Sequence, residues 1–191
     1  MSRVTVKWNG GEWLAKLRVA VDDGLGAAAW VAARHAVRSM SKPGPSAPGA
    51  YPGTDTGLGR ASVVAVHPRE LGTPGRAAYG SNVAYMRKQE FGGIIRAKGK
   101  RYLTVPLNRE AKLLRRRTPD LRSVPGLVIV KGLLGRKGPG GRFVPLFALK
   151  RQVRLPPRPW ALRCGLESAT AMKEAFVKVV RDGLAPVKEG V

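Results

Sequence analysis

The chain has 191 residues, 43% of them hydrophobic, which suffices for one domain with a core of ordinary size. One cysteine and two histidines exclude an internal disulfide and a metal site built from Cys and His ligands. The 35 Lys and Arg against 12 Asp and Glu give a net charge of +23, which predicts anionic partners: nucleic acid, acidic surfaces of neighbouring subunits, or both.

The composition predicts a single domain over residues 1–191, with no run of eighteen apolar residues that could span a membrane. The first residues lack the apolar segment and cleavage site of a secretory signal, so we expect a soluble protein made in the cytoplasm. The positive charge is uneven, because residues 85–158 carry 20 basic side chains against Glu90, Glu110 and Asp120.

Apolar residues recur at three- and four-residue steps from Glu12 to about Met40, which predicts an amphipathic helix. Gly24 and Gly26 fall inside it and each costs roughly 1 kcal/mol relative to Ala, which indicates a bend or a close helix contact. His35 lies near the expected end of this helix, where a surface role or an interaction with the helix dipole is expected.

The next seventeen residues, 41–57, contain four prolines and four glycines. This composition disfavours regular structure and predicts an extended, exposed loop. A loop of this length in a compact domain is usually functional or disordered, and an arm that orders against a neighbouring subunit fits both descriptions.

Alternating, valine-rich or aromatic segments after the loop predict short strands. They cover residues 61–67, 76–80, 102–106, 127–130 and 143–150. The last two flank residues 131–143, a basic and glycine-rich segment that predicts a long hairpin tip. Arg136, Lys137 and Arg142 in this tip indicate a finger that contacts DNA or an acidic partner, and a solvated tip is the alternative.

Residues 112–117 (KLLRRR) form a second basic run, which includes Arg115, Arg116 and Arg117. This run could contact phosphates, although a run of charges is more often simply solvated. No aromatic residue lies between Tyr102 and Phe143, so we do not expect single-stranded nucleic acid to bind there by base stacking.

Residues 161–184 again show apolar side chains at helical spacing and predict a second long helix. Pro157 and Pro159 restrict the entry into this helix, and Trp160 is expected in the core or as a plug between subunits. Cys164 is expected to be a small buried hydrophobe. A helix, several antiparallel strands and a helix together predict an α+β domain with the helices on one face of a sheet.

The sequence does not predict an enzyme. Ser62, His67 and Asp55 lie in the same part of the chain, but no nucleophile-elbow motif frames the serine. His67 is expected at a strand end in a capping or surface role. We therefore expect no catalytic residue, no bound metal and no cofactor.

Three short motifs, in this order along the chain, carry a resemblance to a known family. Their residues are Thr56, Gly57, Tyr85, Glu90, Phe91, Gly92, Gly93, Pro157, Arg158, Pro159 and Trp160. The threonine and glycine step, the aromatic segment ending in EFGG and the PRPW step resemble the tail-completion or virion-morphogenesis proteins of tailed bacteriophages. The chain departs from that pattern at Gly59, where a larger residue is more usual.

The resemblance implies a structural protein of the virion, located at the head-tail junction or upper tail. Such a protein acts in the neck, in tail completion or as a tail terminator, and forms a homo-oligomeric ring, commonly of six subunits. The implied partners are the neighbouring connector or adaptor and tail tube proteins, with genomic DNA in the channel as a further contact. A ring needs head-to-tail contacts that close by rotation, and a long loop and an exposed hairpin suit such contacts.

Two alternatives remain open from the residues themselves. The charge of +23 alone also fits a basic nucleic-acid-binding protein of the ribosomal or nucleoid type. The EFGG motif also has a structural explanation, in which Phe91 anchors the core and Gly92 and Gly93 supply positive φ angles at a turn. Any interface role of Glu90 would then be secondary.

Overall fold

The structure is a computed structural model that describes residues 9–41, 44, 46–53, 55–99, 101–118 and 120–185. The chain divides into two compact units. Unit 1 consists of Met1–Gly92 and Pro156–Val191, and unit 2 consists of Gly93–Leu155. Unit 2 is therefore an insertion in the sequence of unit 1, and the single domain expected from the composition stays a prediction.

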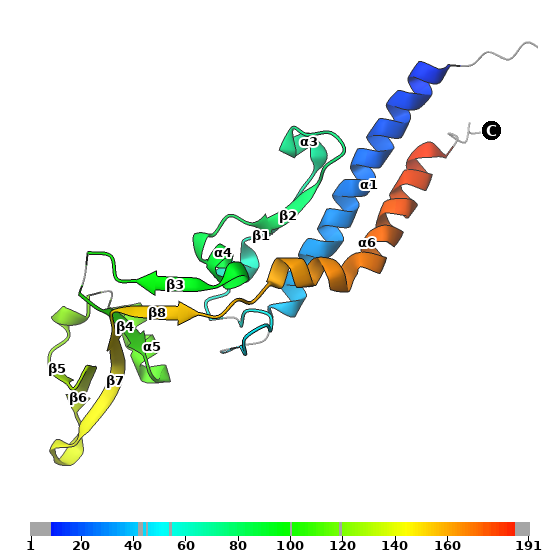
Figure 1. The fold of residues 1–191 in the computed structure, drawn as a ribbon. Helices are drawn as coiled ribbons and strands as arrows, with labels where there is room; N and C mark the ends of the chain where they lie inside the picture. Colours follow the sequence, from blue (N-terminus) through cyan, green and yellow to red (C-terminus); the bar gives the residue numbers. More distant parts are fainter. Residues whose placement is uncertain are drawn as a thin grey trace, which may run out of the picture. The chain divides into compact units, whose positions relative to one another are not determined.

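Unit 1 contains the two long helices that the apolar periodicity predicts (Figure 1). Its elements are α1 (Gly10–Ser39), α2 (Leu58–Ala61), β1 (Val63–Val66), α3 (Pro68–Leu71), β2 (Ala78–Ser81), α4 (Ala84–Phe91) and α6 (Trp160–Leu184). Strands β1 and β2 pair in an antiparallel ribbon. The α+β class, with antiparallel strands and two long helices, is confirmed.

The face of α1 that packs on the core carries small residues. They are Ala20, Gly24, Ala28, Ala29, Ala32, Ala33 and Ala36. A Cβ atom at Gly24 would lie 2.8 Å from Cδ2 of Phe176 and 2.9 Å from Cγ2 of Val180, both on α6. The close helix contact predicted at Gly24 is therefore confirmed, because side-chain size sets how near two helices can pack.

Helices α1 and α6 run antiparallel. Ala20 lies beside Gly183, and the Cys164 thiol donates a hydrogen bond to the Ala32 carbonyl, 2.8 Å away. Cys164 is fully buried, as the sequence predicts. Burial raises the pKa of the Cys164 thiol, which keeps it protonated and unreactive.

His67 caps the short helix α3. Its Nδ1 accepts a hydrogen bond from the Arg69 amide, and its Nε2 lies 3.2 Å from Oδ1 of Asp23 on α1. A Cβ atom at Gly26 would overlap the His67 ring, so glycine lets this cap approach α1. The predicted capping role of His67 is confirmed.

The core of unit 1 lies where α1, α4 and the start of α6 meet. Its buried residues are Ala32, Ala33, Ala36, Met40, Val63, Met86, Trp160 and Cys164. Trp160 is 4% exposed, and its Nε1 donates a hydrogen bond to the Met86 carbonyl, 3.3 Å away. Trp160 therefore lies in the core of unit 1, which is one of the two positions expected for it from the sequence.

The Pro/Gly-rich segment 41–57 has no helix or strand among its described residues, as predicted, but it is held against unit 1 and not extended. The Tyr51 hydroxyl donates to Glu167 at 2.9 Å, and the Gly49 amide donates to the Pro157 carbonyl at 3.2 Å. These side-chain and backbone partners fix the segment, although its composition favours an open loop. Positions 42, 43, 45 and 54 lie outside the described residues, and an arm to a neighbouring subunit stays a prediction.

Unit 2 is built from antiparallel strands and one helix. Its elements are β3 (Gly93–Arg96), β4 (Leu103–Pro106), α5 (Arg109–Arg117), a 3₁₀ turn (Leu121–Ser123), β5 (Leu127–Val130), β6 (Leu133–Lys137), a second 3₁₀ turn (Pro139–Gly141), β7 (Phe143–Lys150) and β8 (Gln152–Leu155). Strands β3 and β8 form a ribbon, and a four-stranded sheet has the order β4-β7-β6-β5. Its buried core consists of Ala111, Leu146 and Phe147.

The predicted hairpin tip at residues 131–143 is wrong in its extent, because strand β6 lies inside it. Lys131 and Gly132 form a two-residue turn, and the loop between β6 and β7 is reduced to residues 138–142. Leu134 explains the difference, because it pairs with Ile129 on one side and with a β7 residue on the other. Strand pairing on both sides overrides the glycine-rich composition.

Candidate functional site

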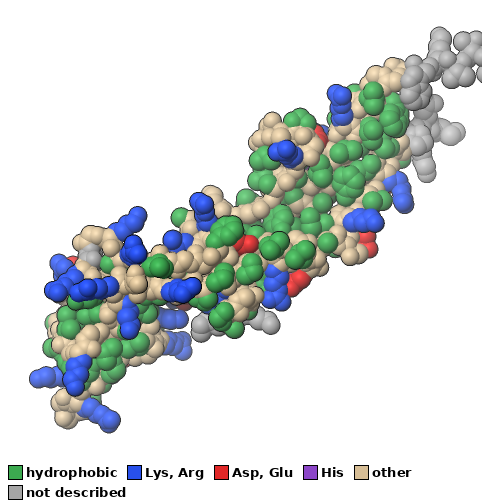
Figure 2. All heavy atoms as spheres, viewed as in Figure 1, with side chains coloured by type: hydrophobic (Ala, Val, Ile, Leu, Met, Phe, Trp, Pro, Cys, Tyr) green, Lys and Arg blue, Asp and Glu red, His purple; other side chains and the backbone are tan. Residues whose placement is uncertain are grey.

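Unit 2 carries most of the net charge of the protein. It contains 17 Lys and Arg against Glu110 and Asp120, a net charge of +15 out of +23. Figure 2 shows Lys and Arg side chains gathered over the strands of this unit. The two units therefore differ in chemistry, and unit 2 is the part of the chain expected to attract anions.

Helix α5 presents part of this basic surface. The Asn108 side chain caps the helix by accepting a hydrogen bond from the Ala111 amide at 2.8 Å. Ala111 and Leu114 pack on the core of unit 2, and apart from the exposed Leu113 the other faces of the helix carry polar and charged side chains. The sequence therefore builds an amphipathic helix whose outer side is cationic.

The three arginines of the basic run form the last turn of α5. All three are exposed, and cations at this end of a helix interact favourably with its dipole. Arg115 donates to the Thr104 carbonyl at 3.1 Å and so also ties α5 to β4. Arg116 and Arg117 extend the basic surface beyond this contact.

The second basic cluster lies at the hairpin between β6 and β7. Arg136 forms an ion pair with Glu110 at 2.7 Å, which links this hairpin to α5. Both partners are about half exposed, so solvent screens the pair and its contribution to stability is small. Lys137 and Arg142 are exposed on either side of the tip. The structure thus brings the two predicted clusters onto one unit through the Glu110 contact.

The second group of predicted residues meets at the start of α6. The Glu90 carboxylate accepts hydrogen bonds from the Ala161 amide at 2.8 Å and from the Leu162 amide at 3.2 Å. Pro159 stands at the N-cap position and makes no side-chain cap there. Glu90 of α4 therefore caps α6 from another element, and its negative charge also complements the helix dipole.

Replacing Glu90 with alanine is expected to lower the free energy of unfolding by about 2 kcal/mol, because two amides at the end of α6 lose a charged acceptor. Glu90→Gln keeps one acceptor oxygen and is expected to cost about half as much. Urea unfolding followed by circular dichroism measures both. Glu174→Ala, at an exposed carboxylate on the same helix, should change stability little; an equal loss for all three variants would contradict the capping role.

Phe91 does not anchor the core. Its side chain is 75% exposed, whereas Met86, five residues earlier on α4, is 2% exposed. Five residues rotate a helix by about 140°, so the two side chains cannot share the buried face. The glycines behave as predicted, because φ is 69° at Gly92 and 133° at Gly93.

The threonine and glycine step begins helix α2, which precedes β1. Thr56 Oγ1 accepts from the Leu58 amide at 3.4 Å, and Gly57 has a φ of 81°. A Cβ atom at Gly59 would lie 2.7 Å from the Met86 sulfur. The packing of α2 on α4 therefore leaves no room for a larger side chain at position 59.

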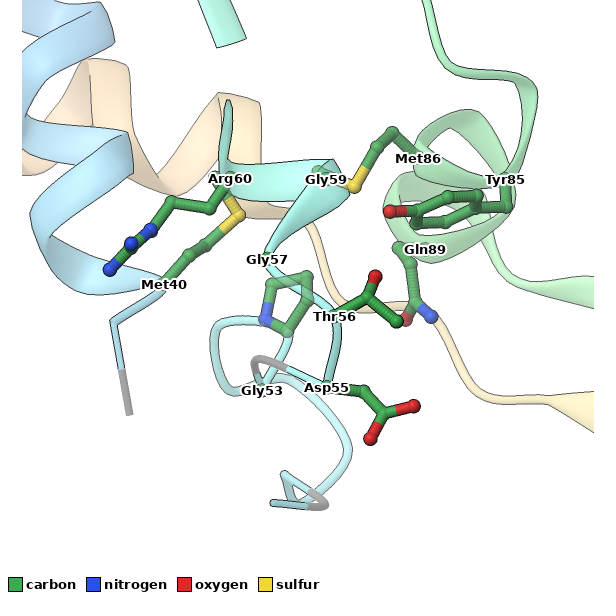
Figure 3. A pocket seen from close by; sticks show the side chains of 11 residues that line it. Met40, Gly53, Asp55, Thr56, Gly57, Gly59, Arg60, Tyr85, Met86 and Gln89 are labelled. Atoms are coloured by element: carbon green, nitrogen blue, oxygen red, sulfur yellow. The ribbon is translucent and has the colours of Figure 1, made fainter. Parts of the chain in front are cut away.

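A hollow of about 270 Å³ lies between these two motif segments (Figure 3). Its lining includes Thr56, Gly57, Tyr85 and Gln89. The hydroxyl and amide groups at its wall offer hydrogen bonds to a small polar group.

Arg158 of the PRPW step connects segments of unit 1 through hydrogen bonds. Its guanidinium donates to the Ser46 carbonyl at 2.7 Å and to the Gln89 side chain at 3.3 Å, and its backbone amide donates to the Gln89 carbonyl. It thereby joins the Pro/Gly-rich segment to the end of α4. This arginine belongs to the scaffold of unit 1 and not to the basic surface.

Glu167 is the centre of a polar cluster on α6. It accepts from Arg163 at 2.6 Å and from Tyr51 at 2.9 Å, and it lies 3.1 Å from His35 Nε2. These partners, Arg163 first, lower the pKa of the Glu167 carboxyl to about 2. Burial, together with Glu167, raises the pKa of the Tyr51 hydroxyl. Sequence reasoning missed this cluster because Tyr51 and His35 precede Glu167 by 116 and 132 residues.

The lowered pKa of Glu167 predicts acid sensitivity. The stability from its ionised form is complete above its ordinary pKa of 4.5 and is lost as the pH falls through about 2. Glu167→Gln is therefore expected to flatten the fall in stability between pH 4.5 and pH 2, measured by urea unfolding at several pH values. Glu174→Gln is the matched control, and an unchanged pH profile in Glu167→Gln would contradict the assignment.

Ser62, His67 and Asp55 do not meet as a nucleophile, base and acid. The Ser62 hydroxyl lies 2.7 Å from the Ser81 hydroxyl, and His67 is engaged with Asp23 and its own helix. In the described part of the chain, no three His, Cys, Asp or Glu side chains are grouped as metal ligands. No helix within the described ranges is long and apolar enough to cross a membrane.

Comparison with known proteins returned no match: no protein-family model, no curated protein and no solved structure is similar to this chain.

Proposed function

We propose that this chain is a structural virion protein of a tailed bacteriophage, a tail-completion or tail-terminator protein that forms a homo-oligomeric ring at the head-tail junction. The order of the three motifs along the chain supports this assignment. Residues of the second and third motif segments converge at the start of α6, where their hydrogen bonds hold the scaffold of unit 1 together. Connector or adaptor proteins and tail tube proteins are the proposed neighbours.

One surface observation carries the assembly part of the proposal. Phe91 is 75% exposed, Leu162 is 63% exposed and Leu166 is 71% exposed. The hydrogen bond between Glu90 and the Leu162 amide places the end of α4 beside the first turn of α6, and Leu166 follows one turn later. We call these three residues the apolar patch. Grouped exposed apolar side chains are typical of surfaces that a partner covers.

The charge distribution favours contacts through unit 1. Two copies of unit 2, each with a net charge of +15, repel one another at close range. Unit 1 carries the apolar patch and a smaller net charge of +8, from 18 basic and 10 acidic residues. In a closed ring the patch of one subunit would meet a different surface of the next. Unit 2 would then be free to bind DNA or acidic partners.

Size-exclusion chromatography with light scattering tests the ring. The wild-type protein is expected to form one closed oligomer that persists at moderate salt and appears as a ring by electron microscopy. Leu166→Glu should give a folded monomer, because it places a charge in the apolar patch. Leu71→Glu, at an exposed leucine of α3, is the matched control and should leave the oligomer intact. A wild-type protein that stays monomeric at every concentration would sink the proposal.

A second function, nucleic-acid binding without a ring, is favoured by the concentration of charge on unit 2. It predicts tight binding to duplex DNA whose logarithm falls steeply with the logarithm of salt concentration, by about 0.9 per phosphate neutralised. Fluorescence anisotropy with a labelled duplex measures this slope. A monomer that binds with a steep slope would replace the ring proposal, whereas weak binding by a salt-resistant oligomer favours the ring.

A further inference from the structure

Strand β5 is an unprotected edge of the four-stranded sheet. Its residues, Leu127–Val130, are all aliphatic, and its one neighbour in the sheet is β6. Ile129 is 67% exposed, and Val130 and Val128 are 40% and 36% exposed. Edge strands usually carry a charged residue, a proline or a bulge that prevents another strand from pairing. Strand β5 has none of these.

The turn that follows β5 fixes which backbone groups point outward. Lys131 and Gly132 have φ angles of 47° and 78°, as in the type I′ turn of a two-residue hairpin. In such a turn the residues on either side of it share a hydrogen bond, so Val130 is bonded to β6. Because bonded and non-bonded positions alternate, the amide and carbonyl groups of Leu127 and Ile129 point away from the sheet.

A groove of about 650 Å³ lies over one face of the sheet and extends from Leu103 on β4 to Leu127 and Ile129 on β5. Aliphatic side chains line much of it: Leu103, Leu127, Ile129, Leu134 and Leu149. Four cations also line it, namely Lys98, Arg101, Arg115 and Arg122, against one acidic residue, Asp120. The groove therefore combines an aliphatic lining with a positive charge.

We propose that the free edge of β5 binds an extended acidic segment of another protein. The segment adds a strand to the sheet through the outward amides and carbonyls of Leu127 and Ile129. The side chains on one face of this strand enter the groove, where the aliphatic ones contact its leucines and the carboxylates contact its four cations. The proposal rests on unit 2 alone and does not depend on the ring.

Charge and lining chemistry select this occupant over two others. Pairing of β5 with β5 of a second copy would bring two units of net charge +15 together, which opposes that contact. Single-stranded nucleic acid satisfies the cations, but its bases stack on aromatic rings, and among the described residues that line the groove Tyr102 is the one aromatic side chain. An acidic segment with aliphatic residues matches both the charge and the lining.

The probe is a labelled peptide of about ten residues with serine at every second position, so that the positions between, which share one face, carry isoleucine and glutamate in turn. The full-length protein is expected to bind it, and the amides of Leu127 and Ile129 should become protected from hydrogen exchange, as measured by NMR. Val128 and Val130, already bonded to β6, should change little. Methylation of alternate peptide nitrogens should weaken binding by about tenfold or more, because it removes the donors to the sheet edge.

Three controls distinguish an acidic segment from the other candidate ligands of the β5 edge. A peptide with lysine in place of glutamate should not bind. Ile129→Glu should abolish binding of the acidic peptide, whereas Val64→Glu, at an exposed strand valine of unit 1 with the same change in charge, should not. Peptide binding without protection at Leu127 and Ile129, preference for oligothymidylate, or self-association that protects these amides would each overturn the proposal.

Discussion

Gly135→Ala is expected to unfold unit 2 while the α1 and α6 pair of unit 1 stays folded. A Cβ atom at Gly135 would overlap the Val144 carbonyl oxygen and lie 2.8 Å from Cζ of Phe143. The residue lies at a register shift between β6 and β7, in the middle of the sheet. Relief of the clash requires the backbones of β6 and β7 to move apart. We therefore expect the free energy of unfolding of unit 2 to fall by about 3 kcal/mol or more.

Amide hydrogen exchange measures in which unit the stability is lost. Protection should disappear over β4 to β7 and remain over α1 and α6. Gly80→Ala in β2 is the matched control, because a Cβ at that strand glycine meets nothing within 4 Å. Equal loss of protection in both units would show that they unfold together, and unchanged protection in unit 2 would contradict the packing at Gly135.

The two long helices could be predicted because each buries one continuous stripe of side chains. The apolar residues of such a stripe recur at helical spacing within one segment of the sequence. Strands β5 and β7 were found for the same reason, since apolar runs bounded by turn residues mark them. Strand β6 was missed because its two leucines lie among Gly132, Gly135 and Gly138, and a glycine-rich composition is typical of a loop. Helix α5 had a readable start at Asn108, an N-cap residue, but its basic run was interpreted only as charge.

The motif residues show where sequence reasoning stops. The roles of Gly92 and Gly93 follow from local backbone geometry, so they could be predicted. The role of Glu90 depends on a contact with residues 71 and 72 positions later, and Phe91 is exposed because α4 is a helix and not a turn. The charge excess was visible in the sequence, but the compact unit on which most of it lies is formed by strand pairing between distant segments.

Trp160→Ala is expected to have the largest effect in unit 1. Trp160 is 4% exposed, packs in the core with Met86 and Cys164, and donates to the Met86 carbonyl. Removal of a buried tryptophan leaves a cavity and an unpaired acceptor, so we expect a loss of about 4 kcal/mol in the free energy of unfolding. Trp160→Phe removes the hydrogen bond but keeps most of the volume, and should cost about 1 kcal/mol.

Urea unfolding followed by circular dichroism is the appropriate measurement, because tryptophan fluorescence would lose its own probe. Trp30→Ala is the matched control, since that tryptophan is 56% exposed on α1. A core residue stabilises each subunit by itself, so the loss at Trp160 should not depend on protein concentration. A plug between subunits would give a loss that grows on dilution below the assembly range, and that result would move Trp160 from the core of one subunit to a contact between two.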